Sequence, residues 1–291
     1  MDKVQPKTLY LVGTPIGNLE DMTFRAVRVL QEVDLIAAED TRHTGKLLQH
    51  FQIQTPQLSY YQHNSQKRIP DILTALQQGK AIALVTDAGM PGVSDPGCEL
   101  VQACIEANIS IIPIPGATAA IAALSASGLP TDAFVFVGFL PLKSKARSQI
   151  LQSLQAETRT LLFYEAPHRI VQTLQDLASH LGENRQVVVA REITKRYEDF
   201  WRGTVADAIA SHSQTLPKGE YTIVLAGNTA TEKSWSPAAI KTELQQLLAQ
   251  GYSRSQASRQ LAGVTNLPRR EIYQLALTIA DAETDQSHEG E

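Results

Sequence analysis

The feature that most constrains the fold is an alternation of short runs rich in β-branched residues with amphipathic stretches. Such a rhythm is typical of sheets covered by helices, because each helix returns the chain to begin another strand. The candidate strands form two successive groups: Leu9–Val12, Leu35–Ala38, Ala81–Val85 and Ile111–Ile114, then Phe134–Val137, Thr160–Tyr164, Val187–Ala190 and Tyr221–Leu225. Helices are expected around Phe24–Leu30, Cys98–Ala107, Lys145–Leu154 and Arg169–His180. The sequence therefore predicts an α/β protein of two lobes with a cleft between them.

Beyond residue 236 the apolar period becomes purely helical. The repeating residues are Ile240, Leu244, Leu247 and Leu248, then Ala257 and Leu261, then Ile272, Leu275 and Ile279. Breaks at Gly251-Tyr252-Ser253 and Leu267-Pro268 divide this stretch into three predicted helices. Residues 237–280 contain five basic and two acidic side chains, a net charge of +3. A basic three-helix unit resembles the helix-turn-helix modules that bind nucleic acid, while a helical cap that packs on the lobes is the alternative.

These patterns predict four segments. Residues 1–115 form an N-terminal α/β domain, 116–230 a second α/β domain, 236–280 a basic helical module and 281–291 a disordered acidic tail. The tail holds five acidic residues and no Lys or Arg, so removing it changes the net charge from −4 to +1. Net charge therefore neither requires nor excludes RNA, whose binding depends on local clusters of Lys and Arg.

Composition excludes several classes of protein. Hydrophobic residues make up 43% and charged residues 19% of the chain, which argues against a wholly disordered or fibrous protein. No apolar run approaches the roughly 18 residues of a membrane span, and the polar start Met1–Lys7 lacks a signal-peptide core. We therefore expect a soluble cytoplasmic protein. Cys98 and Cys104 match neither a disulfide framework nor a zinc spacing, which predicts buried free thiols.

The loops that follow the predicted strands carry unusual residues, and ligands of open α/β sheets bind at that edge. In Thr86–Gly97, three glycines and two prolines fix an irregular backbone, and Asp87 is placed to accept hydrogen bonds from a ribose or a cationic ligand. Other such loops are Gly13–Asn18, Glu39–His43, Pro115–Ala120, Tyr164–Arg169 and Ala190–Lys195. The alternatives are a plain tight turn, a salt-bridged helix cap or surface charge. These loops all follow strands and are expected at one edge of the sheet, which favours a ligand site over these alternatives.

Taken together, the motifs resemble a known family. They are GTPIGNLED (13–21), AEDTR (38–42), VTDAGMPGVSDPG (85–97), PGATA (115–119), FLP (139–141), YEAPHR (164–169) and AREITK (190–195). In this order they are similar to the 16S ribosomal RNA cytidine-2′-O-methyltransferase branch of the tetrapyrrole methylase superfamily. The resemblance spans about residues 9–280 and implies S-adenosylmethionine bound between two α/β domains, a homodimer, and the small ribosomal subunit as partner. Thr86-Asp87-Ala88 replaces the Gly-Asp-Pro of porphyrin-precursor methylases, which favours a substrate other than a tetrapyrrole.

The resemblance also implies site residues. The expected cofactor-binding residues are Gly13, Pro15, Asp87, Met90, Thr118, Ala119, Glu165 and Gly203. A ribose hydroxyl is a weak nucleophile, so a base is expected, with Glu39, Asp40, Glu165 and Glu192 as unranked candidates. The expected RNA-binding residues are Arg42, Arg169, Lys195, Arg254, Arg259, Arg269 and Arg270. The expected chemistry requires no metal.

Three other functions stay open at this point. Asp40, Asp87 and Asp95 are potential metal ligands of a phosphate-cleaving enzyme, although the Gly-Pro loop suits a cofactor groove better. The chain is alternatively a non-enzymatic regulator, in which the lobes sense a ligand and the C-terminal helices bind nucleic acid. Within the superfamily, the alternative is methylation of a tetrapyrrole or another small molecule.

Overall fold

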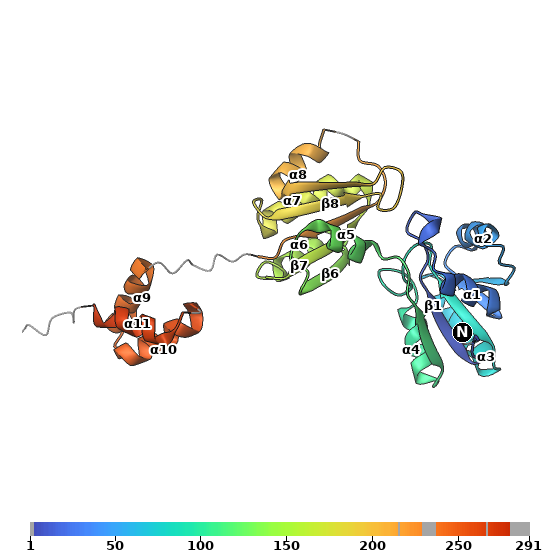
Figure 1. The fold of residues 1–291 in the computed structure, drawn as a ribbon, viewed down its shortest axis with the longest axis horizontal. Coiled ribbons are helices and arrows are strands. Elements are labelled where there is room, and N and C mark those ends of the chain that lie inside the picture. Colours follow the sequence, from blue (N-terminus) through green and yellow to red (C-terminus); the bar gives the residue numbers. More distant parts are fainter. Residues whose placement is uncertain (1–2, 215, 229–236, 266, 280–291) are drawn as a thin grey trace, which may run out of the picture. The chain divides into compact units, whose positions relative to one another are not determined.

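The computed structural model of the chain describes residues 3–214, 216–228, 237–265 and 267–279 (Figure 1). The chain divides into two units, Met1–Asn228 and Thr229–Glu291. Their border lies within the polar, turn-rich stretch 227–236, where a linker is expected from the sequence. Both α/β lobes belong to the first unit, and the predicted boundary between them at 115/116 stays a prediction.

The first lobe holds a five-stranded sheet in the order β3-β2-β4-β1-β5, with every neighbouring pair parallel. Its strands are β1 (Thr8–Val12), β2 (Leu35–Ala38), β3 (Gln57–Ser59), β4 (Ala81–Val85) and β5 (Ser110–Ile114). Its helices are α1 (Phe24–Glu32), α2 (Thr41–His50), α3 (Ser65–Gln77) and α4 (Cys98–Glu106), with a short 3-10 turn at Leu19–Asp21. All five strands end at one edge, where the loops of interest lie.

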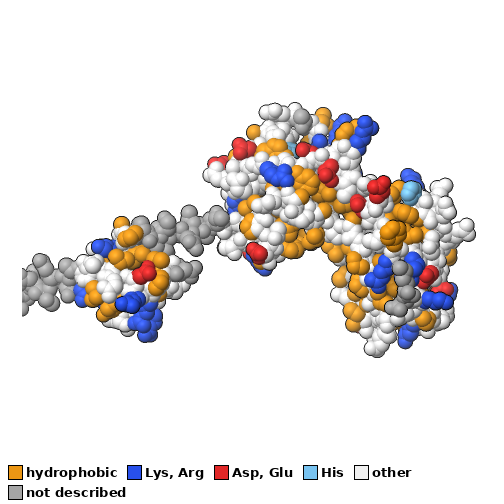
Figure 2. Space-filling model, in the orientation of Figure 1, with side chains coloured by type: hydrophobic (Ala, Val, Ile, Leu, Met, Phe, Trp, Pro, Cys, Tyr) orange, Lys and Arg blue, Asp and Glu red, His pale blue; other side chains and the backbone are white. Residues whose placement is uncertain are grey.

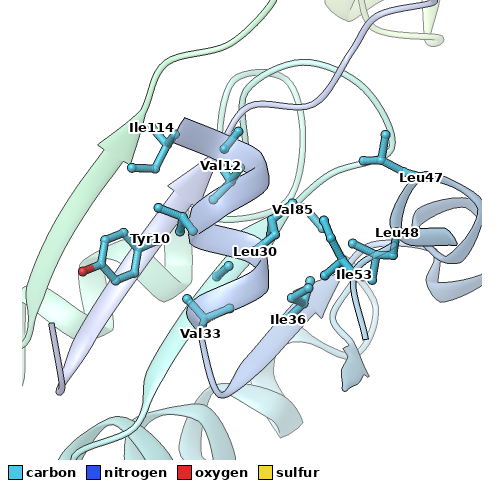
Figure 3. Packing of buried hydrophobic residues seen from close by; sticks show 14 of the residues in the cluster. Tyr10, Val12, Leu30, Val33, Ile36, Leu47, Leu48, Ile53, Val85 and Ile114 are labelled. Atoms are coloured by element: carbon cyan, nitrogen blue, oxygen red, sulfur yellow. The ribbon is translucent and has the colours of Figure 1, made fainter. Parts of the chain in front are cut away.

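Two hydrophobic clusters cover the two faces of this sheet. On one face, Tyr10, Ile36 and Val85 pack against Leu30 of α1 and Leu47 of α2 (Figure 3). On the other face, alternate strand residues pack against α3 and α4; this set includes Leu9, Ala37, Ile82, Leu84, Ile72, Leu76, Leu100 and Cys104. Because side chains of a strand alternate between faces, a sheet covered on both sides needs the continuous apolar runs that the sequence shows.

The second lobe holds a mixed sheet in the order β6-β7-β10-β8-β9. Its strands are β6 (Phe134–Phe139), β7 (Thr160–Glu165), β8 (Gln186–Arg191), β9 (Asp199–Thr204) and β10 (Tyr221–Leu225). β10 lies between β7 and β8 and is antiparallel to both, with Tyr221 opposite both Glu165 and Arg191. β7 and β8 therefore run in the same direction and end at the same edge.

Helices also cover both faces of the second sheet. They are α5 (Ala119–Ser127), α6 (Ser144–Ser153), α7 (Ile170–Leu181) and α8 (Val205–His212), with a 3-10 turn at Pro167–Arg169. α6, α7 and α8 pack on the face that carries Phe163 and Val189. α5 packs on the face that carries Leu162 and Val224, in a cluster that also contains Ile16 of the first lobe. This shared cluster joins the two lobes beside the loop ends.

The predicted strands and helices of both lobes are all present, with ends shifted by at most two residues. The edge strands β3 and β9 and the helices α2, α3 and α8 were not predicted. The expectation of two buried thiols is half wrong, since Cys104 is buried but Cys98 is exposed. Within the described residues, no helix is long and apolar enough to cross a membrane.

The second unit confirms the three predicted C-terminal helices, α9 (Pro237–Ala249), α10 (Arg254–Thr265) and α11 (Arg269–Leu277). Their apolar sides share one cluster of Ile240, Leu244, Leu247, Ala257, Leu261, Ile272, Ala276 and Ile279. Ser253 and Gln256 cap α10 reciprocally, as the Gln256 N–H donates to the Ser253 hydroxyl and the Ser253 N–H donates to Gln256 Oε1. The predicted acidic tail, 281–291, lies outside the described residues.

Candidate active site

Three loops of the first lobe are bonded to one another at the edge where β1, β4 and β5 end. The Thr14 N–H donates to the Gly89 carbonyl at 2.9 Å and the Gly89 N–H returns a bond to the Thr14 carbonyl at 3.1 Å. The Thr14 hydroxyl donates to the Thr86 carbonyl at 3.0 Å. A Cβ on Gly116 would lie 2.8 Å from Gly13 Cα, so two glycines are needed where these loops meet. The glycines and Thr14 therefore fix the loop that carries Asp87 and Met90.

Beside these loops lies a cavity of about 460 Å³ lined by both lobes. The first lobe contributes Ile16, Glu39, Asp87, Ala88, Gly89, Met90, Val93, Ser94 and Asp95. The lining continues with Thr118, Ala119, Phe139, Tyr164, Glu165, Ala166, Pro167, Ile193, Glu220, Tyr221 and Thr222. Six residues expected from the sequence to bind the cofactor or to act as a base meet here: Glu39, Asp87, Met90, Thr118, Ala119 and Glu165. We call this cavity the interlobe pocket.

The interlobe pocket is acidic. Five of its lining residues are carboxylic acids, and none of the described residues that line it is Lys, Arg or His. Burial and the nearby Glu39 and Asp87 carboxylates raise the pKa of Asp95 to about 7. Burial also raises the pKa of Glu39. Glu165 and Glu220 are paired with Arg169 and Lys195, which lie outside the lining, whereas Glu39, Asp87 and Asp95 form no ion pair within the described residues. A site that holds these three acids together is suited to a cationic ligand, which would relieve their repulsion.

Two of these carboxylates are positioned by neighbouring strands. Glu39 follows β2 and accepts a hydrogen bond from the Asp87 N–H at 3.3 Å. Asp87 follows β4, the next strand of the sheet, and accepts from the Asp40 N–H at 3.3 Å. The two loop ends therefore hold each other in place, and the parallel pairing of β2 and β4 places both acids at the pocket.

Glu165 lies at the other side of the pocket, and its side chain is fully buried. It accepts hydrogen bonds from the Ala166 N–H at 2.8 Å and from the Thr173 hydroxyl at 2.6 Å, and it pairs with Arg169 at 3.2 Å. Arg169 also donates to the Leu140 carbonyl at 2.8 Å. With its carboxylate oxygens engaged, Glu165 is poorly placed to act as a base. The structure also argues against Arg169 as a phosphate ligand, because its side chain is 17% exposed and already paired.

The polar cluster after β2, Glu39–His43, includes the salt-bridged helix cap that the sequence offers as an alternative to a ligand site. Asp40 caps α2 by accepting from the Arg42 N–H at 2.8 Å, and two guanidinium nitrogens of Arg42 donate to its carboxylate at 3.1 and 2.7 Å. These bonds hold the pKa of Asp40 well below its ordinary value, which makes it a weak base. Asp40 is not among the residues that line the interlobe pocket. The Arg42 side chain, in contrast, is 89% exposed.

A similar pair occupies the loop after β8. The Lys195 ammonium donates to Glu192 at 2.8 Å and to Glu220 at 2.9 Å. Burial raises the pKa of Glu192, but the hydrogen bonds that its carboxylate accepts from Lys195 and from the Glu220 N–H outweigh burial. The pKa of Glu192 is therefore held below its ordinary value. Glu192 is absent from the described lining of the interlobe pocket. The pair Glu192–Lys195 thus supports the loop, and neither residue has the free charge that a base or a phosphate ligand needs.

Three residues predicted to bind the cofactor lie outside the pocket lining as far as the structure describes it. Gly13 and Pro15 belong to the turn that supports the Asp87 loop, and a Cβ on Gly13 would lie 2.6 Å from Met90 Sδ. Gly203 lies on β9 opposite Val187, where a Cβ would meet the Trp201 ring at 2.5 Å. The structure therefore gives Gly13 a supporting position and places Gly203 in the sheet, away from the pocket lining.

The C-terminal arginines differ in their surroundings. Arg254 donates to the carbonyl oxygens of Ala276 and Ile279 at 3.2 and 3.0 Å, so it binds the end of α11. Arg269 donates to the Ser255 hydroxyl at 2.8 Å and is exposed. Arg259 and Arg270 are exposed. Figure 2 shows Lys and Arg side chains gathered along one side of this unit. Arg254 therefore has a structural position, while the other three are accessible.

Several lining residues were missed from the sequence. Glu220, Tyr221 and Thr222 lie at the start of β10, whereas the sequence predicts a ligand site only in loops that follow strands. Because β10 is antiparallel to its neighbours, its beginning lies at the edge where they end. Asp95 was considered only as a metal ligand, and Phe139 only as part of a motif. The described residues contain no group of three or more His, Cys, Asp or Glu arranged to hold a metal ion.

The fold and the pocket between two α/β lobes define a class. The model of the Tetrapyrrole (Corrin/Porphyrin) Methylases family matches residues 8–209. Among solved structures, a cobalt precorrin-4 methyltransferase is similar with a TM-score of 0.57 and 18% identity, covering 76% of this chain and 95% of that one. Uroporphyrin-III C-methyltransferase from Thermus thermophilus, complexed with S-adenosylhomocysteine, gives a TM-score of 0.53 at 19% identity, covering 75% and 96%. These likenesses show a shared fold.

Sequence relatives are more specific. A protein of Synechocystis sp. named ribosomal RNA small subunit methyltransferase I is 61% identical over 93% of this chain and 98% of its own length. A protein of the same name from Bacillus subtilis is 43% identical over 91% and 92%. The chain belongs to this ribosomal RNA small subunit methyltransferase I family, within the tetrapyrrole methylases. The resemblance drawn from the seven motifs is therefore confirmed.

Proposed function

We propose that the chain transfers the methyl group of S-adenosylmethionine to the ribose 2′-hydroxyl of a cytidine in 16S ribosomal RNA. The observation that carries the proposal is the interlobe pocket, whose five acids have no basic residue among the described lining. S-adenosylmethionine carries a sulfonium and an ammonium group, and both are cations that such a pocket favours. The names of the relatives supply the class of substrate.

The residues of the pocket fit the cofactor. Asp87 and Met90 from one loop and Thr118 and Ala119 from the next would hold it, with Glu165 at the second lobe. The bound cofactor supplies an electrophilic methyl group, so the protein has to place the nucleophile in line and take up a proton. Asp95 also lines the pocket, and of the four acids named from the sequence as candidate bases only Glu39 stays available. It lines the pocket, and burial raises its pKa, whereas Asp40 and Glu192 are paired with cations.

RNA contact is proposed for the exposed arginines, which are Arg42 in the first lobe and Arg259, Arg269 and Arg270 in the C-terminal unit. Exposed guanidinium groups bind phosphates with both charge and geometry. We further propose that the protein acts in the cytoplasm, where ribosomal RNA is made in bacteria, and that it works as a homodimer. Tetrapyrrole methylation is not favoured, because the relatives at 43% and 61% identity are named for ribosomal RNA.

A chain that ends at Asn228 is expected to retain cofactor binding and to lose RNA affinity. The first unit contains every residue that lines the interlobe pocket, so its dissociation constant for S-adenosylmethionine stays within about threefold of the full chain. Loss of exposed phosphate-binding arginines lowers the affinity for 16S RNA by about tenfold or more. Calorimetry measures the affinity for S-adenosylmethionine, and filter binding at fixed salt measures the affinity for 16S RNA. Unchanged RNA affinity contradicts the assignment of the helical unit, and loss of cofactor binding favours a regulator.

The proposed reaction is tested by mass spectrometry of ribosomal RNA from cells that lack the gene. One 2′-O-methylcytidine of 16S RNA is expected to disappear and to return when the gene is restored. An unchanged content of that nucleoside removes the RNA assignment. Calorimetry on the purified protein tests the cofactor separately, since a folded protein that does not bind S-adenosylmethionine removes the assignment of the interlobe pocket.

A further inference from the structure

A second cavity adjoins the interlobe pocket. Its volume is about 360 Å³, and it is lined by residues between β3 and α3 and by the start of α4. Three residues line both cavities: Glu39, Ser94 and Asp95. These residues form a wall with one cavity on each side. We call the second cavity the side chamber.

The side chamber presents hydrogen-bonding groups that the cofactor pocket does not use. The Glu99 carboxylate is oriented by the Ser65 hydroxyl, which donates to it at 2.6 Å. Tyr60 also lines the chamber, but it is 1% exposed and its hydroxyl is buried beside the Leu100 N–H rather than open to the cavity. Gln62 adds an exposed amide.

The chemistry of the chamber suits a nucleoside. A carboxylate accepts a hydrogen bond from the exocyclic amine of cytosine, and amide and hydroxyl groups can satisfy the rest of its pairing edge. Enzymes that modify nucleotides take the target out of the stack and hold it in such a pocket. None of the described lining residues of the chamber is basic, which excludes it as a phosphate site.

We propose that the side chamber receives the target cytidine and that Asp95, in the wall between the two cavities, accepts the proton of its 2′-hydroxyl. This inference rests on the proposed function, and it names the substrate subsite and the base for that reaction. As the 2′-oxygen forms its bond to the methyl carbon, the carbon–sulfur bond breaks and its electron pair goes to sulfur. The hydroxyl proton passes to the Asp95 carboxylate, which releases it to solvent.

The surroundings of Asp95 support this role. The titratable groups that interact with Asp95 are Glu39, Asp87 and Tyr164 of the interlobe pocket. The side chamber, which Asp95 also lines, adds the titratable residues Tyr60, Cys98 and Glu99. Burial and the carboxylates of Glu39 and Asp87 raise the pKa of Asp95 to about 7. A carboxylate with a raised pKa is a stronger base than a carboxylate of ordinary pKa, and at a pKa of about 7 a part of it is still ionised at neutral pH. A bound cation lowers this pKa and increases the ionised fraction.

The central experiment compares the wild type with Asp95→Asn and Asp95→Glu, with Glu106→Gln as a control for the loss of an exposed acid. The methylation rate of 16S RNA at saturating cofactor is expected to fall about 10²–10⁴-fold in Asp95→Asn, to recover in part in Asp95→Glu and to be unchanged in the control. The wild-type rate is expected to rise with pH with a midpoint at or below about 7, and the residual rate of Asp95→Asn lacks this rise. A wild-type rate or pH profile in Asp95→Asn overturns the role of Asp95.

Two further measurements do not depend on that rate. In the cofactor-free protein, NMR of carboxyl carbons is expected to show a titration midpoint near 7 that Asp95→Asn lacks; a midpoint near 4 overturns the proposal.

Glu99 lines only the side chamber. Glu99→Gln is therefore expected to leave calorimetric cofactor affinity unchanged and to lower kcat/KM for RNA by about tenfold or more. Unchanged kcat/KM overturns the chamber assignment. A wild type that binds cofactor and does not methylate RNA refutes the proposed function itself.

Discussion

Replacing Arg169 with methionine is expected to lower the free energy of unfolding by about 3–5 kcal/mol, the cost of removing one partner from a buried ion pair. The Glu165 side chain is fully buried, and Arg169 is the only cation that the structure pairs with it within the described residues. Methionine keeps much of the side-chain volume but leaves the carboxylate without its counter-charge. Chemical denaturation, followed by circular dichroism, measures the change.

Arg68→Met is the matched control for this substitution. Arg68 pairs with Asp71 at 3.4 Å, and both side chains are exposed, at 40% and 63%. Exposed pairs contribute little, so we expect a loss of no more than about 0.5 kcal/mol. The double variant Arg169→Met with Glu165→Gln is expected to be more stable than Arg169→Met alone, because no unpaired charge stays buried. If Arg169→Met keeps wild-type stability but loses RNA affinity, the original expectation of a phosphate ligand is right and the structural position is wrong.

Replacing Gly116 with alanine is expected to destabilise the protein by about 1–3 kcal/mol, the usual cost of overpacking. The added Cβ would lie 2.8–2.9 Å from the Gly13 backbone, and a backbone cannot move aside as a flexible side chain can. The loops that carry Gly13 and Thr118 would have to separate, so cofactor affinity is also expected to fall by about tenfold or more. Denaturation and calorimetry with S-adenosylmethionine measure the two effects.

Gly45→Ala is the matched control in the same lobe, and it is expected to stabilise the protein where Gly116→Ala destabilises it. Gly45 lies within α2, and the nearest atom to an added Cβ is Gln57 Nε2 at 3.6 Å, an ordinary contact. Alanine is a better helix former than glycine, so this variant is expected to be more stable by about 0.5–1 kcal/mol. Cofactor affinity should not change, since Gly45 does not line the interlobe pocket in the described part of the chain. Equal effects of the two substitutions would contradict the close approach of Gly116 to Gly13.

The central strands were predictable because their signal is local. A strand buried on both faces needs a continuous apolar run, and β4 (AIALV) and β8 (QVVVAR) both show one. Two edge strands, β3 and β9, were missed because they lack such a run, whereas the edge strands β5 and β6 were predicted. β3 (QLS) is three residues long, and β9 (DFWRGT) mixes charged with aromatic residues, as partly exposed strands allow. α3 contains Pro70 in its first turns, which obscures its helical pattern.

Part of the candidate site could be predicted from the sequence, because parallel strands end at a common edge. This rule led to Glu39, Asp87 and Thr118. It did not lead to Glu220–Thr222, since no local pattern reveals that β10 runs against its neighbours. The pairings of Arg169 with Glu165 and of Asp40 with Arg42 likewise depend on side-chain geometry that motifs do not encode. Sequence therefore located the pocket, and the structure decided which charges are available in it.

The central position of β10 has a consequence for biosynthesis. Its neighbours β7 and β8 are joined only through β10, so the second sheet stays divided into β6-β7 and β8-β9 until residues 221–225 pair with both. The polypeptide emerges from the ribosome in order, and pairings between distant segments form slowly. The wall that contains Glu220, Tyr221 and Thr222 is therefore completed late in translation. A nascent chain that stops before β10 lacks this wall of the cavity, so the proposed cofactor site is expected to be complete only after β10 has paired with β7 and β8.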